Sequence, residues 1–342
     1  MKGRVIALDE WKGRPAAAMV VDGRLSDLIV DPPAEIVRPG TVYLAVTDRP
    51  VKGQGGIFVR LPQGGTGFLR AKDGVKPGQP VLVQVTGYGE PGKATPLTSK
   101  LLLKGRFAIL TPGAPGLNIS RRIKDEEVRL SLHDAVSGID LGGGGAILRS
   151  NTIEAEPEDV AAELEELATL GANLLSEGGG RDPALLLDGP NAHELALRDW
   201  PSVGDCDDTP GSFARHGIDE MVDGVSRALV QLDGGATAWI EPTRALVAVD
   251  VNTGGDTSAA AGLKANVALT RDLPRQLRCR GLGGQITIDF APMPKRDRRQ
   301  IEQIMRSAFR GDETETAMVG WTPLGHYELQ RKRDRFHWTE PG

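Results

Sequence analysis

Cysteine, histidine and aromatic residues are scarce in this sequence. The chain of 342 residues has two cysteines, five histidines and an aromatic fraction of 4%. Cys206 and Cys279 lie far apart and form no CxxC pair, so the sequence encodes neither a disulfide framework nor a zinc knot. The histidines are scattered and show no metal-ligand spacing. These absences exclude a disulfide-stapled scaffold and a zinc-finger protein.

Long hydrophobic runs are also missing. The N-terminal stretch MKGRVIALDEW has only a short apolar run before Asp9, too short for the core of a signal peptide. No later run approaches the ~20 apolar residues that span a bilayer. The sequence therefore predicts a cytoplasmic protein with no membrane span.

The charge is slightly negative overall but unevenly distributed. A formal net charge of -5 argues against polyanion binding by the whole surface. Residues 154–166 are acidic, whereas residues 291–310 are rich in lysine and arginine. The basic segments indicate either a local groove for a polyanion or ordinary solvated helix faces.

Glycine and proline are abundant, with 44 and 23 residues, which favours many turns and short strands. Residues 1–35 alternate like two strands joined by a turn at Asp22 and Gly23. Residues 37–108 contain five short strands separated by turns, a pattern typical of an OB-type barrel. Residues 109–152 resemble further strands and turns, residues 156–179 are predicted to form a helix, and residues 203–215 resemble a loop.

Two aromatic side chains of the predicted barrel lie opposite its aliphatic face. In the stretch GGIFVRLPQGGTGFLR, alternation puts Phe58 beside Arg60 and Phe68 beside Arg70, away from the aliphatic residues. Exposed rings stack on the bases of single-stranded nucleic acid while arginines meet phosphates. The alternative is that both rings pack under a neighbouring domain.

Two aspartates occupy matching places at the ends of predicted strands. In RALVAVDVNTGG, Asp250 and Asn252 share one face, and in GGQITIDF, Asp289 follows a similar apolar run 39 residues later. The residues between can supply a crossover helix, which would set both carboxylates at one edge of a sheet. Adjacent carboxylates repel unless a cation lies between them, and Mg²⁺ takes one or two carboxylates. The alternative is two unrelated strand-end turns.

The stretch GYGEPGKAT, from Gly87, partly matches a phosphate-binding loop. Ala94 stands where that loop needs Ser or Thr after Lys93, and Pro91 and Pro96 oppose the helix that should follow. A hairpin turn is favoured over a nucleotide hydrolase.

Six motifs resemble those of the ribonuclease E/G family of bacterial endoribonucleases. They are RALVAVDVNTG, RQLRCRGLGGQITIDF, LGHYELQRKR, TGFLR, LNISRRI and GAILRS. The resemblance implies a mixed α/β fold of several subdomains, with an OB-type barrel inserted in an RNase H-like segment and a DNase I-like region after it. It implies these boundaries: an RNase H-like part at 1–36, the barrel at 37–108, a 5′-sensor-like region at 109–158, a helix with a shortened second RNase H-like part at 159–225, and the catalytic region at 226–342.

The resemblance also implies roles for individual residues. Asp250 and Asp289 match the Mg²⁺-binding aspartates and Asn252 their companion in catalysis. Arg149 and Ser150 match a pair that senses a 5′-monophosphate. The expected RNA-binding residues are Phe58, Phe68, Lys93, Arg121 and Arg122. Together these imply a Mg²⁺-dependent endoribonuclease that cleaves single-stranded RNA by water attack and acts in the processing of rRNA precursors or mRNA.

Three departures from the family pattern are visible. The C-terminal CPxCxG segment that links two subunits through zinc is absent, so zinc is not expected and a homo-oligomer would not form through a zinc link. Pro323 replaces an arginine before the family's FG motif, and Pro274 should interrupt the helix between the aspartates. These departures keep a second hypothesis open, a catalytically weakened RNA-binding member of the family.

Overall fold

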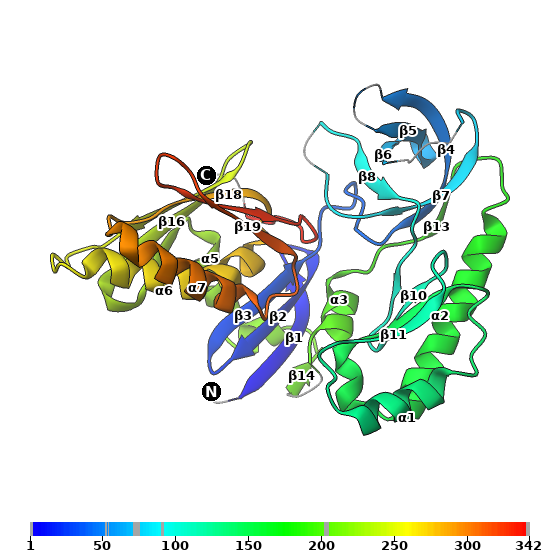
Figure 1. Cartoon of the computed structure of the whole chain (residues 1–342), viewed down its shortest axis with the longest axis horizontal. Helices are drawn as coiled ribbons and strands as arrows, with labels where there is room; N and C mark the ends of the chain where they lie inside the picture. The colour runs from blue at the N-terminus through cyan, green and yellow to red at the C-terminus, as the bar shows by residue number, and fades with distance from the viewer. Residues whose placement is uncertain are drawn as a thin grey trace. The chain divides into compact units, whose positions relative to one another are not determined.

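The computed structural model describes residues 3–51, 53, 55–70, 76–89, 92–201 and 205–339. The chain folds into two compact units, one made of Met1–Pro33 with Val203–Gly342 and the other of Ala34–Ser202 (Figure 1). The second unit is therefore inserted in the sequence of the first. Among the described residues, no helix has the length and apolar character required to traverse a bilayer.

The N-terminal residues of the first unit form a four-stranded sheet. Its strands are β1 (Arg4–Trp11), β2 (Arg14–Val21), β3 (Arg24–Val30) and β14 (Asp205–Asp207), in the order β14-β1-β2-β3. The expectation of two strands in residues 1–35 is wrong, because a second tight turn occurs at Lys12 and Gly13, both of which have positive φ. The predicted loop at 203–215 likewise contains β14, which pairs in parallel with β1. Helices α4 (Ser212–Arg215) and α5 (Ile218–Ser226) follow.

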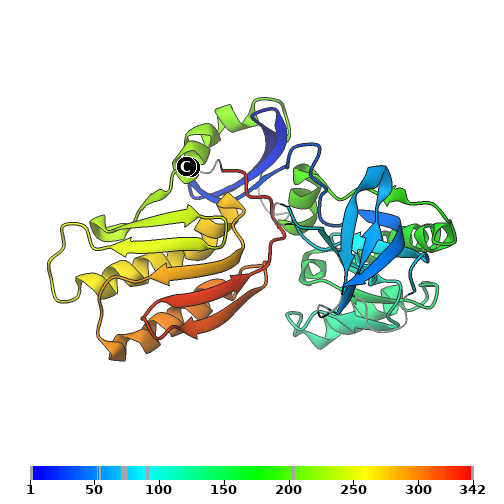
Figure 2. The same cartoon turned by 90° about the horizontal axis from the view of Figure 1, so that it is seen from above.

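The larger sheet of the first unit has six strands. They are β15 (Leu229–Gln231), β16 (Thr237–Pro242), β17 (Val247–Asn252), β18 (Gly284–Asp289), β20 (Tyr327–Arg331) and β19 (Thr316–Trp321), in that spatial order. Helices α6 (Ala261–Arg280) and α7 (Arg298–Phe309) lie against one face (Figure 2). Leu269 and Leu273 of α6 and Met305 of α7 pack on Val249 and Ile288 of the strands. The alternate residues of β17 and β18 point away from these helices and are exposed or half-buried.

Helix α6 is continuous, and the prediction that Pro274 would interrupt it is wrong. Pro274 lies inside the helix and is buried. A proline in a helix interior removes one N–H donor and costs about 3 kcal/mol. The leucines of α6 that fill the core of the sheet offset this cost, so packing outweighs the local preference of proline.

The second unit contains a closed barrel. Its strands are β4 (Val42–Val51), β5 (Gly56–Arg60), β6 (Thr66–Leu69), β8 (Thr95–Thr98) and β7 (Pro80–Val85), and pairing between β4 and β7 closes the ring. Val59, Leu69 and Val83 fill its interior. Strand β13 (Ala184–Leu187) pairs in an antiparallel way with the first residues of β4. The predicted five-stranded barrel is confirmed.

The rest of the second unit is a small sheet covered by helices. Its strands are β11 (Gly116–Ile119), β12 (Gly145–Leu148), β10 (Ala108–Thr111) and β9 (Leu103–Lys104), and its helices are α1 (Glu126–Val136), α2 (Pro157–Glu177) and α3 (Ala192–Asp199). The predicted helix is confirmed as α2, which packs Val160 and Leu164 into the core. The expectation of strands and turns alone at 109–152 is wrong, because Asp125 caps α1 by accepting bonds from two backbone N–H groups.

The two units together make a mixed α/β fold with a closed five-stranded barrel, which confirms the predicted fold class. The subdomain boundaries implied by the resemblance stay predictions.

Candidate active site and RNA-binding surfaces

The paired aspartates lie side by side on neighbouring strands. Strand β17, helix α6 and strand β18 form a parallel strand–helix–strand unit, and its register sets Asp250 directly opposite Asp289. Neighbouring strands run ~4.8 Å apart, so the two carboxylates share one short stretch of the sheet. Both point to the face without helices, and the side chain of Asp289 is 65% exposed. The expected placement of the carboxylates at one edge is confirmed.

Asn252 lies on the same face and holds one of the carboxylates. Its side-chain amide donates a hydrogen bond to Oδ2 of Asp250 at 2.8 Å. This bond uses a donor of the amide and leaves its carbonyl oxygen available as an acceptor or a metal ligand. The asparagine therefore orients Asp250 without adding a charge.

A histidine that was not predicted lies beside Asp289. His326 belongs to the turn between β19 and β20, and its Nε2 is 3.8 Å from Oδ1 of Asp289. The backbone N–H of Thr322 donates to the carbonyl of His326 and closes this turn. The motif LGHYE contains the histidine, but only the pairing of β20 with β18 brings it to the aspartate.

The donor set fits a hard divalent cation. Asp250, Asp289 and Asn252 offer oxygen ligands on an exposed face, and Mg²⁺ uses one or two carboxylates and keeps several waters. In the described part of the chain, no lysine or arginine forms an ion pair with either aspartate, and no cluster of three or more His, Cys, Asp or Glu suited to a metal is found. A site of two carboxylates suits a metal that is shared with a phosphate ligand.

The aromatic residues of the barrel lie opposite its core, as predicted. Phe58 and Phe68 are directly paired across β5 and β6, and their rings meet edge to face with centroids 6.0 Å apart. Both rings are partly exposed, whereas Ile57 and Val59 are buried. The guanidinium of Arg49, which sequence reasoning missed, lies 5.7 Å from the ring centroid of Phe58. This surface combines aromatic faces with positive charge.

The other predicted RNA-binding residues are exposed. Lys93 lies in the connection between β7 and β8, whose residues 90 and 91 are outside the described range. Arg121 and Arg122 are exposed in the turn between β11 and α1, where Ile123 anchors the backbone. All three belong to the same unit as the barrel.

The predicted sensor arginine is already bound to a carboxylate. Arg149 donates to Asp199 at 2.8 Å and to the carbonyl of Gly105 at 2.6 Å, and its side chain is 17% exposed. Arg198 also pairs with Asp199, at 2.7 Å. Burial alone would raise the pKa of Asp199, but the hydrogen bonds and charges of the two arginines hold that pKa below its ordinary value. Ser150 begins a 3₁₀ turn directly after the arginine.

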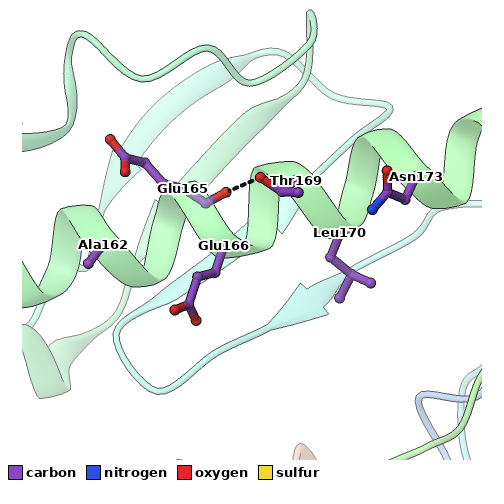
Figure 3. Close-up of a pocket in the computed structure, with 6 residues that line it drawn as sticks. All are labelled: Ala162, Glu165, Glu166, Thr169, Leu170 and Asn173. Atoms are coloured by element: carbon purple, nitrogen blue, oxygen red, sulfur yellow. Dashed lines mark hydrogen bonds between the residues drawn. The ribbon is translucent and has the colours of Figure 1, made fainter.

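A shallow open pocket of about 560 Å³ lies on the surface of α2 (Figure 3). Its lining includes Glu165, Glu166 and Leu170 and none of the predicted site residues. Two carboxylates in an open depression repel a phosphate backbone. The pocket is therefore no candidate for RNA binding.

A barrel with partly exposed aromatic rings beside arginines, together with paired carboxylates on a second sheet, is an arrangement typical of proteins that bind and process nucleic acid. Residues 102–205 and 202–334 match the model of the ribonuclease E/G family. The chain belongs to this family.

Several curated proteins are similar to the chain over most of its length. Ribonuclease E of Nostoc sp. is 29% identical over an alignment of 375 positions, which covers 93% of this chain and 54% of the relative. Ribonuclease E of Escherichia coli K12 is 27% identical, with 92% and 35% covered, and ribonuclease G of Salmonella typhimurium is 26% identical, with 93% and 77% covered. The chain thus spans about half or less of these ribonucleases E.

Proposed function

We propose that the chain is a Mg²⁺-dependent endoribonuclease that cleaves single-stranded RNA. The register that pairs Asp250 with Asp289 is the observation that carries this proposal. The names of the relatives, ribonuclease E and ribonuclease G, support the same class of reaction.

In this proposal, the acidic residues of the exposed sheet face hold the metal. Asp250 and Asp289 would be its protein ligands, and the bond from Asn252 fixes the orientation of Asp250. When bound, Mg²⁺ activates water and stabilises charge on the phosphodiester. The oxygen of water bonds to phosphorus while the bond to the 3′ oxygen breaks and that oxygen takes a proton. The products carry a 5′-phosphate and a 3′-hydroxyl.

The second unit would bind the RNA strand. Phe58 and Phe68 offer ring faces to bases, and Lys93, Arg121 and Arg122 offer charge to phosphates. Arg149 and Ser150 would recognise a 5′-monophosphate, which must compete with Asp199 for the guanidinium. Stimulation by a 5′-monophosphate therefore depends on the exchange of one anion for another.

The competing proposal is that the chain is an RNA-binding protein whose catalysis is weakened. Pro323 motivates it, because this residue lies in the β19–β20 turn that carries His326 to Asp289. The fold and the barrel surface would be the same in both proposals.

Cleavage of a 5′-monophosphorylated single-stranded RNA by the purified protein separates the two proposals. The nuclease proposal predicts cleavage with Mg²⁺ that EDTA abolishes, and a 5′-phosphate on each downstream product. Measurable RNA affinity with no cleavage that EDTA can abolish would instead establish the RNA-binding protein.

A further inference from the structure

Trp239 is an exposed tryptophan on the helix-free face of the larger sheet. It lies in β16, where Ala238 and Ile240 are buried against the helices and Trp239 points the other way. The residue is 42% exposed. An indole this exposed gives up part of the hydrophobic stabilisation that full burial would supply.

The other four tryptophans of the chain are packed. Trp200 and Trp338 are buried, Trp11 contacts Trp338, and Trp321 contacts Phe290 and Tyr327. None of the ring contacts found in the described part of the chain involves Trp239. The exposed indole is therefore an exception within this molecule.

Strand register places Trp239 beside the paired aspartates. Trp239 is opposite Asp250 in the antiparallel pair of β16 and β17, and Asp250 is opposite Asp289 in the parallel pair of β17 and β18. The three residues form one row across the sheet, with strands ~4.8 Å apart. An exposed ring thus lies one strand away from the carboxylates.

On the side of the aspartates, the neighbours of Trp239 on β17 are too small to cover its ring, and on the other side its partner is Leu229 of β15. The positions diagonal to Trp239 on β17 are occupied by Ala248, whose side chain is only a methyl group, and by Asn252, whose side chain is hydrogen-bonded to Asp250. Neither can extend across an indole. A flat ligand next to the aspartates can therefore reach the face of the ring.

We infer that Trp239 stacks on the base of a nucleotide that flanks the scissile phosphate of bound single-stranded RNA. This inference rests on the proposed function, because the aspartates locate that phosphate. Every base has a face that can stack on an aromatic ring, so the contact positions the strand without selecting a sequence. Trp239 is thus a substrate-positioning contact in the unit that holds the aspartates, separate from the aromatic pair of the barrel.

A cycle that combines a protein variant with an RNA variant tests this contact. Trp239→Ala should lower kcat/KM about 5- to 150-fold, the range for loss of one stacked base, while Trp239→Phe keeps most of the rate. An abasic nucleotide next to the cut should slow the wild type by a similar factor and should not slow Trp239→Ala further. Val319→Ala is the matched control, since Val319 is 62% exposed on β19 of the same sheet and should leave the rate unchanged.

The inference would be overturned if the tryptophan substitution and the abasic nucleotide changed the cleavage rate independently of each other. If the tryptophan and abasic changes multiply, or if Trp239→Ala cleaves like the wild type, the ring does not contact a flanking base. A Trp239→Ala protein with an altered oligomeric state and an unchanged response to the abasic site would show that a second copy covers the ring, which also contradicts the inference. Trp239→Phe keeps the test valid if the alanine variant folds poorly.

A fluorescence titration separates this inference from the proposed function. If the wild type cleaves no RNA, the proposed function fails, and quenching of tryptophan fluorescence by a single-stranded oligonucleotide then decides the stacking contact. Trp239→Phe should lose most of that quenching if the indole stacks on a base. Equal quenching in the wild type and in Trp239→Phe would overturn the inference.

Discussion

Two groups of charged residues, one in each unit, balance their charges in opposite ways. Asp250 and Asp289 lie together with no lysine or arginine paired to them in the described part of the chain. Asp199 instead lies between Arg149 and Arg198, so its group has one positive charge in excess. The first group needs a cation from outside, whereas the second is nearly satisfied internally and retains a weak attraction for an anion. The difference indicates a ligand site in the first unit and a more structural role for Asp199 in the second.

Removal of Asp199 should have the largest effect on stability. Asp199→Asn leaves two partly buried arginines without their carboxylate and should lower the free energy of unfolding by about 3 kcal/mol. Chemical denaturation measures this change. Asp134→Asn is the matched control, because the side chain of Asp134 is 83% exposed on α1. Equal stability of the two variants would show that the Asp199 group is not a structural ion pair.

The same substitution should release Arg149 for a phosphate. We expect Asp199→Asn to increase the preference for 5′-monophosphorylated over 5′-hydroxylated RNA, because the guanidinium no longer has a competing carboxylate. Binding titrations with the two RNAs at a temperature where the variant is folded measure the preference. A preference identical to that of the wild type would argue against Arg149 as a 5′-phosphate contact.

The contribution of Asp199 to the free energy of unfolding should also depend on pH. Its pKa in the folded chain is below the ordinary value, so the stabilisation is present above the unfolded pKa of about 3.9 and is lost as the pH falls through the folded value. The difference in unfolding free energy between the wild type and Asp199→Asn should therefore be constant near neutral pH and shrink below about pH 4. A difference that grows on acidification would contradict this assignment.

Loss of an aromatic ring from the barrel should have a smaller effect than loss of Asp199, and it should change only the affinity for RNA. Phe58→Ala or Phe68→Ala should each weaken binding of single-stranded RNA by about 1–3 kcal/mol. Leu102→Ala removes an exposed apolar side chain from the same unit and should leave affinity unchanged. If the barrel variants bind RNA like the wild type, the half-exposed rings do not contact bases.

The smallest effect should be the response of stability to Mg²⁺. The cation binds the folded pair and should raise the melting temperature of the wild type, with about 1.4 kcal/mol of stabilisation at ten times the dissociation constant. Asp250→Asn combined with Asp289→Asn should abolish this response and relieve the repulsion between the carboxylates. A double variant that Mg²⁺ still stabilises would move the metal to another part of the chain.

Local patterns in the sequence predicted the parts of the candidate site that lie on regular strands. Alternation and two matching strand ends were enough to place Asp250 beside Asp289, and alternation also separated Phe58 from the core. The pairing of Arg149 with Asp199 joins residues 50 positions apart and leaves no periodic signal. His326 was missed for the same reason, because only the pairing between strands brings it near Asp289.

Some errors in the predicted fold had local causes and others did not. The tight turn at Lys12 and the helix cap at Asp125 have recognisable sequence signals. The third N-terminal strand and α1 could therefore have been predicted from the sequence. Pro274 is different, because only the packing of α6 on the sheet explains a proline within a continuous helix. Tertiary contacts override local preference at that position.

The rate of RNA cleavage by single aspartate variants tests the central claim most directly. The measurement compares the wild type, Asp250→Asn, Asp289→Asn and Asp223→Asn, which removes an exposed carboxylate on α5, on one single-stranded RNA with Mg²⁺. We predict that each site variant loses at least about 100-fold in rate while binding RNA like the wild type, and that Asp223→Asn keeps full activity. Undiminished cleavage by both site variants would contradict the account.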